Sequence, residues 1–126
     1  PFIASFIGSM NFIPASINAS KKVKCNNLEI NCDVGSFTEN DYVQLAIRPE
    51  EIQFHQENQD DNVVSGVIKE IEFLGSFQRV YFETKNFSDE LIIVDVPSSN
   101  AKKINMDINN EMSLYFSKED ARIYSV

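Results

Sequence analysis

The segment 42–52, YVQLAIRPEEI, constrains the fold more than any other stretch, because a strand with a clear register ends there at a proline. From Val43 to Ile47 every second residue is a large aliphatic one, which predicts a strand with one buried and one solvated face. Proline cannot donate to a sheet ladder and holds the preceding residue extended, so strand pairing must end before Pro49. Arg48 and Glu50 then flank a rigid corner with opposite charges. We interpret this corner as a docking feature and not as a catalytic one.

The size and composition indicate a single globular domain. A chain of 126 residues with 43% hydrophobic and 24% charged residues can bury a core without a metal or a disulfide. No apolar run approaches the roughly 20 residues that a membrane span requires, and no cleavable signal segment is present. The net charge of −8 argues against a nucleic-acid backbone or an anionic membrane surface as the partner. We therefore expect no nucleic-acid binding and no direct membrane insertion.

The alternation of apolar and polar residues predicts an all-β fold, a small barrel of short antiparallel strands. Only residues Phe2–Ser9 read as a helix, which Gly8 would end. Pro14 demotes the first strand to an edge or marks a bulge, and Gly66 inside the longest strand is typical of a strongly coiled barrel strand. Residues 98–110 are expected to form a loop with at most one helical turn. The strands are expected at 11–19, 21–25, 28–33, 42–48, 63–74, 77–84, 90–96, 112–117 and 121–126.

The two cysteines are expected to be reduced. Cys25 and Cys32 fall in one predicted hairpin with Asn26-Asn27 as its turn, which separates them by roughly 13 Å along one face. A disulfide needs Cα atoms within about 7 Å of each other. Two thiols without a bridge favour a cytosolic protein.

The motifs of catalysis and metal binding are missing from the sequence. There is no phosphate loop, no GxSxG, no CxxC and no HExxH. The acidic loop 53–62 lacks the central glycine of a calcium loop, and its His55 is the one histidine of the chain. We predict no catalytic, cofactor-binding or metal-binding residues, although a spatial pair of carboxylates stays open. The aromatic residues are expected to pack in the core and not to stack on bases.

Three segments together resemble a known family. The first, FIASFIGSMNFIPASI, resembles the stretch that leads out of the ATPase domain in ATP-binding subunits of ABC importers. The second ends in Arg-Pro-Glu, and the third is a strand ending in Phe-Leu-Gly before an aromatic-rich partner strand. The chain therefore resembles the C-terminal TOBE (transport-associated OB-fold) domain of the maltose, polyamine, iron, sulfate and phosphonate importer group. The residues that match are Phe6, Ile7, Gly8, Asn11, Arg48, Pro49, Glu50, Phe73, Leu74 and Gly75.

The resemblance implies one regulatory domain over residues 1–126, with a helical lead-in at 1–10 and an OB-like β-barrel at 11–126. Such a domain is not an enzyme; ATP and Mg would bind in an ATPase domain encoded before Pro1, which fits a chain that starts without methionine. The partners implied are that ATPase domain, a second copy of the subunit and, through the ATPase domain, transmembrane permease subunits. The location implied is cytoplasmic, at the inner face of the cell membrane. Candidate docking residues are Phe6, Asn11, Arg48, Pro49, Glu50, Phe73, Gly75 and Ser76.

Three other functions are weighed against this one. TOBE relatives include small oxyanion sensors of the molybdate type, and Gly75-Ser76 with Ser98-Ser99 would permit such a site, although the net charge of −8 opposes it. A nucleic-acid-binding OB barrel is opposed by the same charge. A free-standing enzyme has no residue to nominate. The acid-rich loop and the ending KEDARIYSV depart from the family pattern and leave the transported substrate open.

Overall fold

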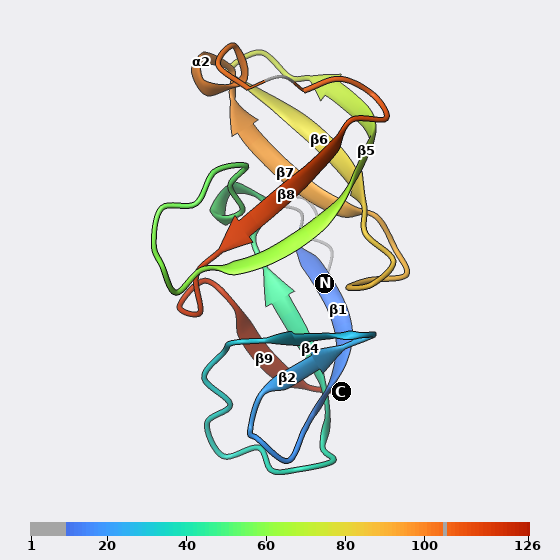
Figure 1. The fold of residues 1–126 in the computed structure, drawn as a ribbon, viewed down its shortest axis with the longest axis vertical. Helices are drawn as coiled ribbons and strands as arrows, with labels where there is room; N and C mark the ends of the chain where they lie inside the picture. Colours follow the sequence, from blue (N-terminus) through green and yellow to red (C-terminus); the bar gives the residue numbers. More distant parts are fainter. Residues whose placement is uncertain (1–9, 105) are drawn as a thin grey trace.

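The computed structural model describes residues 10–104 and 106–126, which form an all-β body with very little helix (Figure 1). This confirms the predicted fold class. The helix expected at Phe2–Ser9 lies outside the described residues. The described residues contain two short helical turns, η1 (Pro49–Glu51) and α2 (Ser98–Ala101). The strands are β1 (Asn11–Ile17), β2 (Val23–Cys25), β3 (Leu28–Ile30), β4 (Tyr42–Ile47), β5 (Asn62–Phe73), β6 (Phe77–Glu83), β7 (Ile92–Pro97), β8 (Glu111–Phe116) and β9 (Arg122–Ser125).

The strands are divided between two curled antiparallel sheets. The first sheet has the order β3-β2-β1-β4-β9, and the second has the order β7-β6-β5-β8. In Figure 1 the second sheet and α2 occupy the upper half of the molecule, and most of the first sheet lies below them. The last strand, β9, returns to the first sheet after β8 has completed the second, so the chain crosses between the sheets more than once.

The long strand β5 shows the coiling that its glycine predicts. Its first half pairs with β8, from Asn62 opposite Phe116 to Val67 opposite Glu111. Its second half pairs with β6, and the register shifts between Ile68 and Glu70. Such a bulge increases local twist and bends a strand. One strand thus serves as the spine of the second sheet.

Pro14 lies in β1, which has a neighbouring strand on each side in the first sheet. At Pro14 itself, however, only β4 pairs with β1. β1 pairs with β4 from Asn11 to Ser16, but its pairing with β2 covers only Ser16 and Ile17. Proline therefore costs this sheet no ladder hydrogen bond at that position. The expectation that Pro14 makes β1 an edge strand or marks a bulge in it is wrong, because β1 is the central strand of its sheet and its register with β4 is continuous; the register shift lies in β5.

The core is built from the inward faces of both sheets. Its members are mostly aliphatic, and Phe82 and Phe87 are the largest fully buried side chains among the described residues. The rings of Phe87 and Phe116 lie 5.9 Å apart. Packing is thus the role of these three aromatic residues, as expected. Phe12 and Phe73 differ, because 51% and 74% of their surfaces are exposed.

Two buried asparagines connect one sheet to the other. Asn11, the first residue of β1, accepts from the N–H of Ile93 and donates to its carbonyl, both at 2.8 Å. Asn62, the first residue of β5, accepts from the N–H of Asn31 at 2.8 Å and donates to its carbonyl at 3.0 Å. Each side-chain amide therefore makes the pair of hydrogen bonds, to one backbone N–H and one carbonyl, that a neighbouring strand would make. These bonds cross the boundary between the two sheets. Both side chains are only 5% exposed, so these bonds satisfy groups that water reaches poorly.

Gly66 is required for a close approach between β5 and β6. A Cβ atom at this position would lie 2.1 Å from the carbonyl oxygen of Glu83 and 2.6 Å from a ring carbon of Phe82. The first of these atoms belongs to the backbone and cannot rotate away. A side chain of any size at position 66 would therefore push the two strands apart.

We predict that Asn11→Ala and Asn62→Ala each lower the free energy of unfolding by about 1–3 kcal/mol, because each leaves one backbone N–H and one carbonyl without a partner. Urea unfolding of the chain, followed by circular dichroism, measures this loss. Asn58→Ala is the matched control, since Asn58 is exposed and its side chain makes no recorded hydrogen bond. Equal stability of all three variants would contradict the role assigned to the two amides.

We predict that Gly66→Ala destabilises the fold by about 1–3 kcal/mol through overpacking. Thermal unfolding measures the effect. The control is the neighbouring Ser65→Ala, at an exposed position of the same strand, which should change stability by less than about 0.5 kcal/mol. Similar melting temperatures for the two variants would refute the close approach.

Candidate docking surface

The Arg-Pro-Glu corner has the geometry that the sequence predicts. Strand pairing ends at Ile47, Arg48 is extended with φ −75° and ψ 140°, and Pro49 begins η1. Pro49 is buried, whereas Arg48 and Glu50 are exposed. Because η1 packs against β7 of the second sheet, the corner is held from both sheets. Its two charges are thus presented by a rigid support.

Behind the corner lies a pair of acidic residues that sequence analysis missed. Burial raises the pKa of Glu51, and the neighbouring Asp120 carboxylate raises it further, while Arg48 and Arg122 oppose the shift. Both acids line a cavity of about 350 Å³ with Glu50, Glu57 and Asp61. The two positions are far apart in the sequence, so no local pattern could have shown the pair. In residues 10–104 and 106–126 no three His, Cys, Asp or Glu side chains are arranged to hold a metal ion.

The tip between β5 and β6 carries the exposed half of the Phe-Leu-Gly motif. Phe73 is 74% and Leu74 43% exposed, and Gly75 has a φ of 83°, which favours glycine. In Figure 1 this tip lies beside α2 at one end of the molecule, whereas η1 follows β4 nearer the middle. The structure therefore does not bring the two motifs into one site.

The tip is fixed by hydrogen bonds from α2. The Ser98 hydroxyl donates to the carbonyl of Gly75 at 2.7 Å, and the Ser98 N–H donates to the carbonyl of Ser76 at 2.9 Å. Below the tip, Arg79 lies 5.7 Å from the centre of the Phe77 ring and forms two bonds to Asp95, at 2.8 and 3.0 Å. An exposed phenylalanine on a braced turn can dock without further ordering.

The remaining candidate residues are placed differently. The amide of Asn11 is used inside the fold, where it binds Ile93. Phe6 lies outside the described residues. The docking role of the eight candidates stays a prediction, and Phe73 presents the largest apolar surface among those that the structure describes.

The cysteines are free, as the sequence predicts. Burial raises the pKa of Cys25 to about 12, with a smaller effect from Cys32, and burial with the charge of Asp33 raises that of Cys32 to about 11. The thiol of Cys32 donates to the carbonyl of Ala121 at 3.1 Å. Since the thiolate is the nucleophile, neither residue has the chemistry of a reactive cysteine near neutral pH.

No helix among the described residues is both long and apolar enough to cross a membrane.

Comparison with known proteins identifies the family. A family profile described as TOBE domain matches residues 45–123. An Fe(3+) ions import ATP-binding protein, FbpC 2 from Rhizobium meliloti, is 20% identical over 135 residues, covering 98% of this chain and 34% of the relative. A spermidine/putrescine import ATP-binding protein, PotA from Onion yellows phytoplasma, is 22% identical over 125 residues, covering 99% of this chain and 27% of the relative. The chain thus spans about a third or less of these relatives.

A solved structure shares the fold. The cytoplasmic molybdate-binding protein ModG, in a form with molybdate bound, superposes with a TM-score of 0.70 over 92% of this chain and 96% of that one, at 8% identity. At that identity the likeness concerns the fold alone, and it supports the OB-like class expected from the sequence. Because the family profile covers more than half of its residues, the chain belongs to the TOBE domain family.

Proposed function

We propose that this chain is the non-catalytic regulatory and dimerisation domain of the ATP-binding subunit of an ABC importer. One observation carries the proposal. Nearly the whole chain aligns with import ATP-binding proteins, and the aligned part is about a third or less of the length of each of them. The remaining two thirds of such a subunit would contain the ATPase domain, with its ATP and Mg, and its contacts to the permease. The domain would then work in the cytoplasm at the inner face of the membrane.

The physical role is to hold two copies of the subunit close together. A link between two modules raises the effective concentration of one for the other, even when the link itself is weak. The braced tip at Phe73 suits this role, because its backbone is already ordered and burial of this large apolar side chain then costs only the rotamer freedom of the side chain itself. The corner at Arg48 and Glu50 adds two opposite charges, which favour one orientation of a partner.

We predict that Phe73→Ala in the full-length ATP-binding subunit raises the dissociation constant of the nucleotide-free dimer by about tenfold, the effect of losing a buried aromatic anchor. Sedimentation equilibrium measures the constant. Phe12→Ala removes a similarly exposed ring from the other sheet and serves as the matched control. If removal of residues 11–126 leaves dimerisation unchanged, the tethering role is wrong.

Oxyanion binding is the alternative, and its support is the shared fold with a molybdate-binding protein. One of the two residue pairs expected to form such a site is partly engaged within this fold, through Ser98. The hydroxyl and the N–H of Ser98 both donate to carbonyls of the β5–β6 tip, so neither is directed at an anion. The first function is therefore the better supported one.

We predict that isothermal titration of the 126-residue chain with molybdate, sulfate or phosphate shows no saturable heat at concentrations up to about 100 μM, because both donors of Ser98 are already bonded and the net charge of −8 opposes an anion. Saturable binding at micromolar ligand would establish the oxyanion function in place of the tethering role.

A further inference from the structure

A large open cleft lies on the side of the first sheet where β9 is found. Its volume is about 1220 Å³. Residues 31–37, from the connection between β3 and β4, form one wall, and residues 121–124, from β9 and its approach, form the other; residues 20–22 also line the cleft. The Cys32 thiol of the first wall donates to the carbonyl of Ala121 in the second.

One wall of the cleft is the open edge of a sheet. β9 is the last strand in its sheet and pairs with β4, from Val43 opposite Ser125 to Ala46 opposite Arg122. In the part of the chain that the structure describes, no strand pairs with its other side. An edge strand presents unpaired N–H and carbonyl groups along that side, and an extended peptide can add to them as a new strand.

The side chains around this edge select an alternating sequence. Ile123 is partly buried against the core, while its neighbours Arg122 and Tyr124 are exposed. On the opposite wall Val34 and Phe37 also pack partly buried against the core. A strand beside β9 would direct every second side chain towards these apolar groups and the others towards solvent. The first set should therefore be apolar.

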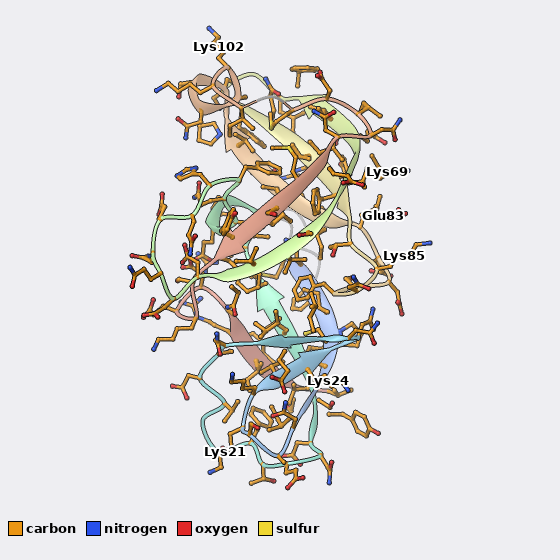
Figure 2. The ribbon with its side chains drawn as sticks, viewed as in Figure 1. Lys21, Lys24, Lys69, Glu83, Lys85 and Lys102 are labelled. Atoms are coloured by element: carbon orange, nitrogen blue, oxygen red, sulfur yellow. The ribbon has the colours of Figure 1, made fainter. Side chains whose placement is uncertain are left out.

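The charged residues around the cleft determine which side chains are favoured at the solvent-facing positions of the added strand. The cleft is lined by four basic residues and three acidic ones, although the whole chain has 11 basic and 19 acidic residues. Figure 2 shows Lys21, which lines the cleft, near the end of the molecule opposite Lys102. A locally basic groove on an acidic protein complements an acidic segment. The basic residues are Lys21, Lys22, Lys118 and Arg122, and the acidic ones are Asp33, Asp60 and Glu119.

We propose that the cleft beside β9 binds an extended peptide of a partner protein, in which apolar and acidic residues alternate, as a strand added to the first sheet. This goes beyond the tethering role, which uses the other end of the molecule. A second copy of the chain at this edge is an alternative that the test below separates from a partner peptide. The net charge of −8 opposes a nucleic acid.

The first test uses the 126-residue chain labelled with ¹⁵N and a heptapeptide of alternating valine and glutamate. Saturable shifts of the amide signals of residues 122–125 and 33–37 are expected, with slower hydrogen exchange in β9. A heptapeptide of alternating valine and lysine should bind at least about tenfold more weakly. Methylation of the backbone nitrogens, either of all the valines or of all the glutamates, should abolish binding in one of the two peptides, because only one set of N–H groups faces β9.

The second test exchanges charges on the protein. Lys22→Glu combined with Lys118→Glu is expected to weaken binding of the acidic heptapeptide by about fivefold or more, since two favourable charges become unfavourable. Lys102→Glu combined with Lys103→Glu makes the same change of net charge away from the cleft, and should alter affinity by less than about twofold. All four lysines are exposed, so the variants should fold alike.

Several results would overturn the proposal. These are the absence of shifts with about 1 mM heptapeptide, equal binding of the lysine heptapeptide, and equal weakening by the two charge variants. Concentration-dependent shifts at β9 without any peptide would show that a second copy occupies the edge. Tighter binding of an oligothymidylate to the same residues would assign the cleft to nucleic acid. Neither of these two outcomes decides the tethering role, because that role is tested by dimerisation of the full-length subunit.

Discussion

Two amide bridges from buried asparagines join the two sheets beside the hydrophobic core that both sheets share. Each sheet satisfies its own strands, and neither sheet has enough strands to surround a core by itself. Asn11 and Asn62 each begin a strand and bind the backbone of the opposite sheet through both polar atoms of the amide. These directional bonds add to the packing of side chains from both sheets in a single core.

Of the surfaces assigned a role, the charged corner depends most directly on that arrangement. The charged corner follows β4 of the first sheet but rests on β7 of the second, so a shift between the sheets would tilt it. The β5–β6 tip belongs to the second sheet and is braced by α2. The β9 cleft is formed where the first sheet curls without closing, between its last strand and the segment that leaves β3. In the two roles that we propose, rigid support would serve both ends of the molecule, one for an apolar contact and one for an added strand.

The sequence predicted what depends on local periodicity. The strands, the end of pairing before Pro49, the coiling of the strand that contains Gly66 and the free thiols all follow from residue spacing or from the limits of proline and glycine. The division into two sheets did not, because it depends on which distant strands pair. The bridge from Asn11 to Ile93, the acidic pair of Glu51 and Asp120, and the basic cleft each join residues far apart in the chain. Residue type alone gives no signal for contacts between residues that are distant in the sequence. Asn11, for example, was a candidate docking residue, whereas the structure has its side chain inside the fold.

The central claim, that this domain acts as a rigid docking module between two copies of an import ATP-binding subunit, is tested most directly by hydrogen exchange on the full-length subunit. Mass spectrometry would compare peptides that contain residues 73–77 at protein concentrations below and above the dimer dissociation constant, without nucleotide. Slower exchange at this tip in the dimer, with unchanged exchange in the buried strands, is the predicted result. Identical exchange at the tip in monomer and dimer would contradict the account.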